Sequence, residues 1–219
     1  PEPDIRAAAC AASKLQGGPV LLFEKVQGYR DKQVAMNVHG SWENIALSFD
    51  LPKKMKVKEQ FYEIADRWDR YPLPPERVDH APVKEVILDK DISLFRELPL
   101  FRVNRMDGGF FFSKGCVVAR DPENPDIQNV GIYRMQIKDH DRLGIQISAQ
   151  HDLAIFLRKA EERNMPLRVA VAISNDPVTS FVASSPLKYH EDEYAMMGAL
   201  RGAPTKVITS ERGGLDVPA

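Results

Sequence analysis

The chain has 219 residues and a mass of 24.7 kDa, enough for one large domain or for two modest ones that share a core. Its contents of 43% hydrophobic and 28% charged residues are ordinary for a globular protein and exclude a disordered or fibrous chain. Thirty Lys and Arg residues oppose 31 Asp and Glu residues, so the formal net charge is -1. Such a balance gives no long-range attraction to nucleic acid or to an anionic membrane, and we expect neither partner.

The two cysteines, Cys10 and Cys116, lie far apart and suggest neither a disulfide framework nor a paired metal motif. The longest apolar stretches, such as residues 168–174, are much shorter than a membrane span, and the first residues do not resemble a basic and apolar leader. These features favour a reduced, cytoplasmic location. The chain begins without Met and ends on an extended apolar segment, so we expect it to be part of a longer protein.

The first 75 residues are predicted to form a small α/β layer. We expect helices over residues 4–15, 41–47 and 57–70, the last with apolar residues at spacings of three and four. Short strands are expected over residues 20–23 and 34–38. The proline-rich residues 71–75 disfavour a helix, because proline lacks the N–H group and restricts the residue before it. The predicted N-terminal α/β domain is therefore residues 1–75.

Beyond residue 75 the pattern changes to closely spaced strands with two helices. The predicted strands are residues 85–88, 110–120, 128–138, 144–147, 169–173 and 206–209. The predicted helices are residues 151–164 and 192–200. Turn signals between the strands favour an antiparallel or barrel-like sheet with helices on it. The predicted fold class is mixed α/β: the N-terminal layer followed by a β domain with helices over residues 76–219.

The strand at residues 128–136 contains polar residues in an unusual arrangement. Alternation along a strand puts Asn129 and Tyr133 on one face and Ile132 and Arg134 on the other. A buried guanidinium needs an anion, so Arg134 is either a binding residue or an edge-strand residue in a surface salt bridge. Asn129 is either a metal ligand or an amide that closes a turn.

A histidine stands where a strand passes into a helix. The N-terminus of a helix disfavours the charged form of His151 and favours a neutral imidazole that can bind a metal. The alternative is that Asp152 caps the first turn and that His151 is incidental.

Two further segments contain residues suited to anions or cations. Ser184 and Ser185 follow an apolar run that we expect to be a strand, and their hydroxyls and amides suit a phosphate, although such a sequence is also common in loops. Glu191 and Glu193 stand at a helix start, where carboxylates usually compensate the helix dipole. An Asn, a His and a Glu together would form a hard ligand set suited to Mn²⁺ or Mg²⁺.

Taken in order, these segments resemble the UbiD family of decarboxylases that use prenylated FMN. The similarity runs over essentially the whole chain and is closest to the hydroxyarylic acid branch, which acts on 4-hydroxybenzoate or vanillate. Its most specific part is the Asn-x-Gly-x-Tyr-Arg block at residues 129–134 with the downstream pair Gln150 and His151. The matching segments are residues 36–42, 98–102, 107–110, 128–135, 150–152, 193–194 and 198–199. The fold implied for residues 76–219 is a prenylated-FMN-binding split barrel, incomplete at its C-terminus.

The resemblance implies a site for the flavin and for a divalent metal, usually Mn²⁺, that bridges the cofactor phosphate to an Asn, a His and a Glu. The implied metal ligands are Asn129, His151 and Glu193, with Glu191 as the alternative to Glu193. Arg134 is the implied catalytic residue, facing the flavin and the substrate carboxylate. A potassium ion also accompanies the phosphate in relatives. The implied cofactor-binding residues are Asn129, Ile132, Arg134, Gln150, Ser184, Ser185 and Glu193.

The implied activity is the reversible, non-oxidative loss of CO₂ from a phenolic aromatic acid. A flavin prenyltransferase would supply the cofactor, and the parent protein would be a homo-oligomer. The family's catalytic glutamates lie in a Glu-Gly-Pro-Phe-Gly-Glu motif expected beyond Ala219, so we expect the 219 residues alone to be inactive. Two alternatives are a non-catalytic module that binds flavin or metal, and a metal-dependent hydrolase built on His151, Asp152 and Glu193.

Overall fold

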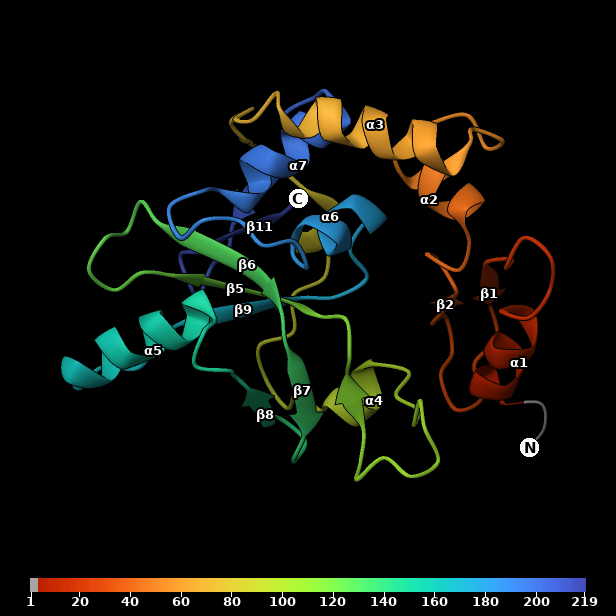
Figure 1. Cartoon of the computed structure of the whole chain (residues 1–219). Coiled ribbons are helices and arrows are strands. Elements are labelled where there is room, and N and C mark those ends of the chain that lie inside the picture. The colour runs from red at the N-terminus through yellow and green to blue at the C-terminus, as the bar shows by residue number, and fades with distance from the viewer. Residues whose placement is uncertain (1–3) are drawn as a thin grey trace. The chain divides into compact units, whose positions relative to one another are not determined.

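The structure is a computed structural model that describes residues 4–219 (Figure 1). It is a mixed α/β fold with several small sheets, as predicted, and no sheet closes into a barrel among the described residues. By their internal contacts the residues form two compact units. Unit 1 contains the chain up to residue 62 together with residues 88–112 and 136–144, and unit 2 contains residues 63–87, 113–135 and 145–219. Residues 1–3 of the predicted N-terminal domain lie outside the described residues.

Unit 1 contains the predicted N-terminal layer up to residue 62, and residues 63–75 of that predicted layer belong to unit 2. Its strands β1 (Leu21–Phe23) and β2 (Val34–Met36) pair antiparallel, with Leu22 opposite Ala35. Two of its helices begin at side-chain caps, because Asp4 accepts a hydrogen bond from the amide of Ala7 and Ser41 accepts one from Asn44. The two capped helices are α1 (Ile5–Ala12) and α2 (Trp42–Ser48). Unit 1 also contains the first half of α3 (Val57–Trp68), α4 (Leu94–Glu97) and β4 (Phe111–Phe112).

Unit 2 is built around a three-stranded antiparallel sheet in the order β6-β5-β9. The central strand places Val118 opposite Val130 on one side and Ala170 on the other. The strands are β5 (Cys116–Arg120), β6 (Gln128–Ile132) and β9 (Val169–Ala172). Residues 116–119 of β5 are fully buried, and such a continuous apolar strand is typical of a sheet covered on both faces.

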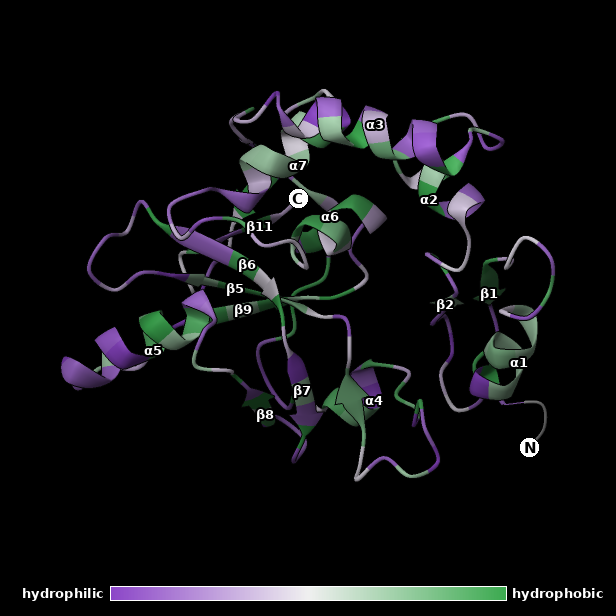
Figure 2. Ribbon diagram, in the orientation of Figure 1, coloured by the Kyte–Doolittle hydropathy of each residue, from purple (hydrophilic) through white to green (hydrophobic). Residues whose placement is uncertain are grey.

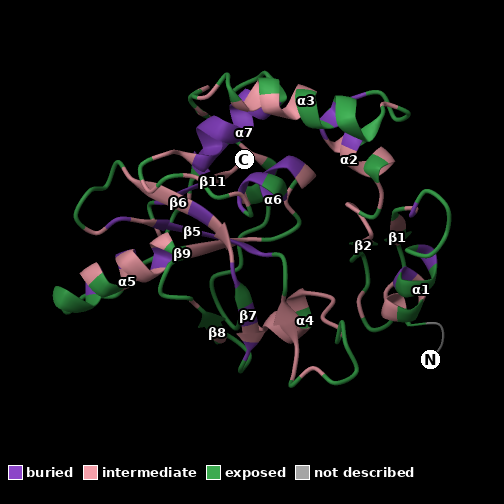
Figure 3. Cartoon of the chain, viewed as in Figure 1, coloured by how far each residue is buried: buried purple, intermediate pink, exposed green. Residues whose placement is uncertain are grey.

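Among the described residues, three α-helices lie wholly in unit 2, which also contains the second half of α3. They are α5 (Asp152–Glu162), α6 (Pro177–Val182) and α7 (Glu193–Arg201). Helix α5 is mostly hydrophobic in its first half and hydrophilic toward its end (Figure 2), and it buries Leu153 and Phe156. By contrast α7 is buried along nearly its whole length (Figure 3). Gly198 permits this packing, since a Cβ atom there would lie 2.7 Å from the backbone oxygen of Leu73 in the proline-rich segment.

A second sheet of unit 2 has the order β11-β10-β3. Strand β10 (Lys206–Thr209) pairs antiparallel with β11 (Asp216–Pro218) and parallel with β3 (Glu76–Arg77). A short 3-10 helix follows β3 at Pro82–Lys84. Strands β7 (Arg134–Ile137) and β8 (Leu143–Gln146) each contain a point at which the chain passes from one unit to the other.

Several predicted elements differ in the structure. Residues 85–88 are not a strand, and Val86, one of the apolar residues that suggested one, is 75% exposed. The predicted strand at 110–120 is interrupted between β4 and β5, and the one at 128–138 is interrupted at Tyr133. The predicted strand before Ser184 is helix α6 instead. In α3 the apolar stripe is less buried than its spacing suggests, since Phe61 is 70% exposed.

Candidate functional site

The centre of the candidate site is a pair of side chains from β6 and α7. Asn129 donates a hydrogen bond from Nδ2 to Oε1 of Glu193 at 2.7 Å. Glu193 is the first residue of α7, whose N-cap Asp192 accepts a hydrogen bond from the amide of Tyr194. Only 5% of Glu193 is exposed, and its second oxygen, Oε2, has no hydrogen-bond partner among the described residues. Burial raises the pKa of this carboxyl to about 8.

Tyr133 connects Asn129 to His151. Its hydroxyl donates to Oδ1 of Asn129 at 3.3 Å, and its ring meets the imidazole of His151 edge to face, with 5.3 Å between the ring centres. Burial raises the pKa of Tyr133 to about 12, so the phenol is a neutral donor at physiological pH. The ring has room because residue 131 is glycine: a Cβ atom there would lie 2.7 Å from a ring carbon of Tyr133. The predicted common face of Asn129 and Tyr133 is confirmed.

His151 is the N-cap residue of α5, so its predicted position at a helix N-terminus is confirmed. The alternative in which Asp152 is the cap is wrong, because Asp152 is the first residue of the helix. The imidazole is exposed and accepts a hydrogen bond at Nδ1 from the amide of Ser148 at 3.4 Å. Burial raises the pKa of the neighbouring Asp152.

These side chains line one pocket of about 560 Å³, formed entirely by residues of unit 2. Seven residues predicted to bind cofactor or metal line this pocket, six of them polar and the seventh Ile132. Its lining residues are Asn129, Val130, Gly131, Ile132, Tyr133, Gln150, His151, Asp152, Ala183, Ser184, Ser185, Pro186, Leu187 and Glu193. The structure thus brings together residues that are up to 64 positions apart in the sequence.

The serine pair reaches the pocket from a different local structure than predicted. Ser184 and Ser185 follow helix α6, and their amides donate to the carbonyls of Phe181 and Val182. Their hydroxyls donate to the carbonyls of Ser180 and Phe181, at 2.8 and 2.9 Å. Their hydroxyl oxygens keep acceptor capacity, and a hydroxyl can rotate toward an anion, whereas the amides are engaged in the end of the helix.

Two predicted site residues lie outside the pocket lining. Arg134 is exposed at the start of β7, because the strand that was predicted to continue through it ends at Ile132. Glu191 accepts a hydrogen bond from the amide of Lys188 at 2.9 Å and pairs with its ammonium group, so its carboxylate has partners away from Asn129. Of the two glutamates left open by the sequence, Glu193 is the one that contacts Asn129.

The residue that sequence analysis missed is Tyr133. The sequence pattern put Tyr133 on the correct face but gave it no part in the site, although the Asn-x-Gly-x-Tyr spacing indicates that its ring can reach Asn129. A glycine between two polar residues of one face leaves space for the large ring to fold back over it.

The polar groups of the pocket fit a divalent cation. Oε2 of Glu193 is a buried oxygen without a partner, Oδ1 of Asn129 has a second lone pair, and the acceptor nitrogen of His151 is Nδ1, whose contact with the Ser148 amide is long at 3.4 Å. This is a hard oxygen and nitrogen set of the kind that Mn²⁺ and Mg²⁺ accept. Within residues 4–219 no group of three or more His, Cys, Asp and Glu side chains is arranged to hold a metal, so the amide of Asn129 is needed to complete this set.

None of the helices in the described part of the chain is long and apolar enough to cross a membrane.

Two parts of the chain match known protein families. Residues 1–68 match the 3-octaprenyl-4-hydroxybenzoate carboxy-lyase N-terminal domain, and residues 76–219 match the Rift-related domain of the same enzymes. The chain therefore belongs to the UbiD family.

Individual relatives are close in sequence and in structure. A phenolic acid decarboxylase of Bacillus subtilis is 50% identical over 222 residues, which cover 100% of this chain and 47% of that protein. The closed form of vanillic acid decarboxylase from Sedimentibacter hydroxybenzoicus has a TM-score of 0.95 and 49% identity, covering 100% of this chain and 47% of that one. An evolved dimeric form of the UbiD-class enzyme HmfF from Pelotomaculum thermopropionicum, in complex with prFMN, has a TM-score of 0.85 and 30% identity, covering 96% and 48%. The chain spans about half the length of these relatives.

Proposed function

We propose that the protein containing this chain is a prenylated-FMN-dependent carboxy-lyase that removes CO₂ reversibly and without oxidation from a phenolic aromatic acid. The 4-hydroxybenzoate or vanillate type of substrate is favoured, because the phenolic acid and vanillic acid decarboxylases are about 50% identical to this chain. The proposed metal is Mn²⁺ or Mg²⁺, with a potassium ion as a further component.

One observation supports this proposal above the others. Asn129 lies in strand β6, His151 is the N-cap of α5 and Glu193 is the first residue of α7, yet all three line one pocket. Oε2 of Glu193 is buried there without a partner, and an adjacent cation would provide one and favour the ionised carboxylate. We therefore propose these three residues as the metal ligands.

The roles proposed for the other pocket residues concern binding and orientation. Ser184 and Ser185 offer hydroxyls to the phosphate of the flavin, while Ile132 and Gln150 lie along the pocket where the rest of the cofactor would bind. Tyr133 holds Oδ1 of Asn129 through its hydroxyl. When bound, prenylated FMN supplies an electron sink for the charge left on the substrate as CO₂ departs.

We also propose that Arg134 orients the substrate carboxylate. It directly follows Tyr133 at the start of β7, and a guanidinium is suited to two parallel hydrogen bonds with a carboxylate. Because the guanidinium of Arg134 is exposed, it stays hydrated while no substrate is bound and needs no other anion nearby, which is compatible with this role.

Further elements of the proposal concern the whole protein. Turnover needs an acid that protonates the carbon from which CO₂ leaves, and we propose that glutamates outside these 219 residues provide it. The 219 residues alone would then be inactive. We further propose a homo-oligomer that receives its cofactor from a flavin prenyltransferase in the cytoplasm, where the thiols of Cys10 and Cys116 stay free.

The test uses the complete protein purified from cells that co-express a flavin prenyltransferase. Incubation with 4-hydroxybenzoate or vanillate is expected to release CO₂ and the corresponding phenol, and ¹³C-bicarbonate is expected to enter the carboxyl group of the acid. Protein from cells without the prenyltransferase is the control and is expected to be inactive. Equal CO₂ release by both preparations would contradict the role of the cofactor, and no release by either would contradict the substrate class.

A further inference from the structure

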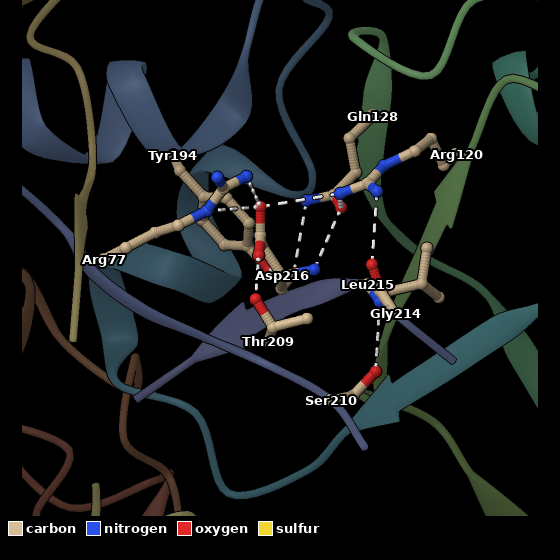
Figure 4. A network of polar contacts seen from close by, with 9 residues as sticks. All are labelled: Arg77, Arg120, Gln128, Tyr194, Thr209, Ser210, Gly214, Leu215 and Asp216. Carbon is tan, nitrogen blue, oxygen red and sulfur yellow. Dashed lines mark hydrogen bonds and ion pairs between the residues drawn. The ribbon is translucent and has the colours of Figure 1, made fainter. Parts of the chain in front are cut away.

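A group of polar side chains surrounds Asp216, the first residue of β11 (Figure 4). The side-chain amide of Gln128 both accepts from the backbone N–H of Asp216 and donates to its backbone carbonyl, each at 3.2 Å. The hydroxyl of Tyr194 donates to the same carbonyl at 2.9 Å. The backbone of one residue is therefore held by two side chains from different elements, β6 and α7.

Both of these side chains are sequence neighbours of proposed metal ligands. Gln128 precedes Asn129 in β6, and Tyr194 follows Glu193 in α7. Because successive residues of a strand point to opposite faces, Gln128 reaches Asp216 on one side of β6 while Asn129 reaches the pocket on the other. The two elements are thus joined twice, once inside the pocket between Asn129 and Glu193 and once behind it through Asp216.

The position of Asp216 is itself well fixed. Its carboxylate accepts hydrogen bonds from Arg77 at 2.6 Å and from Thr209 at 2.9 Å, and it pairs with Arg120 at 3.5 Å. Burial alone would raise the pKa of this carboxyl, but the hydrogen bonds from Arg77 and Thr209 outweigh that effect and hold the pKa below its usual value. The carboxylate is therefore charged and compensated at physiological pH, and Arg120 also donates to Oε1 of Gln128 at 3.2 Å.

We propose that Gln128 and Tyr194 are positioning residues that set the separation between Asn129 and Glu193 by holding the backbone of Asp216 from both elements. This inference rests on the proposed function, since it takes Asn129 and Glu193 as metal ligands. Substitution of a side chain that orients a metal ligand in this indirect way commonly lowers the affinity for the metal by about 10- to 100-fold.

The test compares Tyr194→Phe and Gln128→Met in the complete, flavin-free protein. Tyr194→Phe removes a single oxygen from a side chain that is 1% exposed, so the packing of the ring is kept. Each variant is expected to weaken Mn²⁺ binding about tenfold, measured as free Mn²⁺ by electron paramagnetic resonance. The double variant is expected to lose less Mn²⁺ binding free energy than the two single variants lose together, because both side chains act through the backbone of Asp216. Val207→Ala, a buried truncation in β10, is the control and is expected to lower Tm but leave Mn²⁺ affinity unchanged.

A second measurement separates this inference from the proposed metal site. In crystal structures of the metal-free variants, Nδ2 of Asn129 is expected to lie beyond about 3.5 Å from Oε1 of Glu193. Absence of Mn²⁺ binding by the parent protein would refute the metal site, while a lengthened contact in the variants would still support positioning. Unchanged contacts with unchanged affinity would overturn the positioning role. An equal loss of affinity in Val207→Ala would overturn it as well, since the effect would then follow general stability.

Discussion

At position 193 a carboxyl group is buried with one oxygen bonded to Asn129 and the other without a partner among the described residues. Its pKa is raised from 4.5 to about 8, first of all by burial. Between these two values the folded protein holds a proton that the unfolded chain has lost, so rising pH destabilises the folded state by about 1.4 kcal/mol per pH unit. We predict that Glu193→Gln in the metal-free protein removes this loss, so that the variant gains stability relative to the parent between about pH 5 and pH 8.

Urea unfolding at the two pH values measures this effect, and Glu191→Gln is the matched control. The carboxylate of Glu191 is bonded to Lys188 and its pKa is lowered, by the backbone hydrogen bond from Lys188 first. That variant is expected to keep the pH dependence of the parent between about pH 5 and pH 8. A Glu193→Gln variant with the same pH dependence as the parent would show that Glu193 does not titrate in this range.

Gly131 is the residue over which the ring of Tyr133 folds. A Cβ atom there would lie 2.7 Å from the ring of Tyr133, so Gly131→Ala must displace the ring and its hydrogen bond to Asn129. We expect a loss of about 1–3 kcal/mol in the free energy of unfolding, measured with urea. Gly108→Ala is the control, since the nearest atom to its Cβ would be 4.0 Å away. Equal stability of the two variants would mean that the ring is not held over Gly131.

At this scale strand periodicity correctly predicted that Asn129 and Tyr133 share a face, because it depends only on local geometry. It left open whether Arg134 is buried or exposed, and the strand break at Tyr133, which interrupts the alternation, leaves Arg134 exposed. The convergence of Asn129, His151 and Glu193 was expected from the family resemblance. Spacing alone could not reveal it, because tertiary packing brings these residues together.

At the scale of elements, the start of α7 fixes where Glu193 lies. The N-cap Asp192 accepts a hydrogen bond from the amide of Tyr194, and removal of such a cap costs about 1 kcal/mol. We predict that Asp192→Ala has this cost and also weakens Mn²⁺ binding severalfold, because the first turn carries a proposed ligand. Asp4→Ala removes the cap of α1 in unit 1 and is expected to have a similar cost with no change in Mn²⁺ affinity. Urea unfolding and Mn²⁺ titration of both variants test the difference, and equal Mn²⁺ affinities would contradict it.

The elements themselves were predictable where periodicity and caps agreed. Helices α1, α2, α5 and α7 and strand β10 lie where the sequence indicated. Helix α6 was missed because a short apolar run such as 181–183 is ambiguous between strand and helix. Asp176 before Pro177 is a helix-start signal that would have identified it. The apolar residues 86–88 suggested a strand, yet they are exposed, and periodicity contains no information on what covers a segment.

At the scale of the whole molecule, unit 1 combines three segments that are separate in the sequence, up to residue 62, 88–112 and 136–144. Composition and the proline-rich segment could suggest a boundary near residue 75, but they could not reveal that later segments belong with the first. The domain division at residue 75 stays a prediction.

The chain spans about half the length of its relatives, and the proposed general acid lies outside it. We predict that residues 1–219 produced alone release no detectable CO₂ from 4-hydroxybenzoate, whereas the complete protein loaded with cofactor does. Gas chromatography of the headspace measures both. CO₂ release by residues 1–219 would contradict the proposed need for groups from the rest of the protein.

We propose that the pocket lined by Asn129, His151 and Glu193 holds prenylated FMN together with a divalent metal. A native mass spectrum of the complete protein, purified from cells that co-express a flavin prenyltransferase, tests this proposal. The spectrum of the parent protein is expected to contain mass increments for prenylated FMN and for one Mn²⁺ per chain, and His151→Ala is expected to lose the metal or to bind much less of it. A parent protein that carries neither increment, or a His151→Ala variant that keeps full metal occupancy, would contradict it.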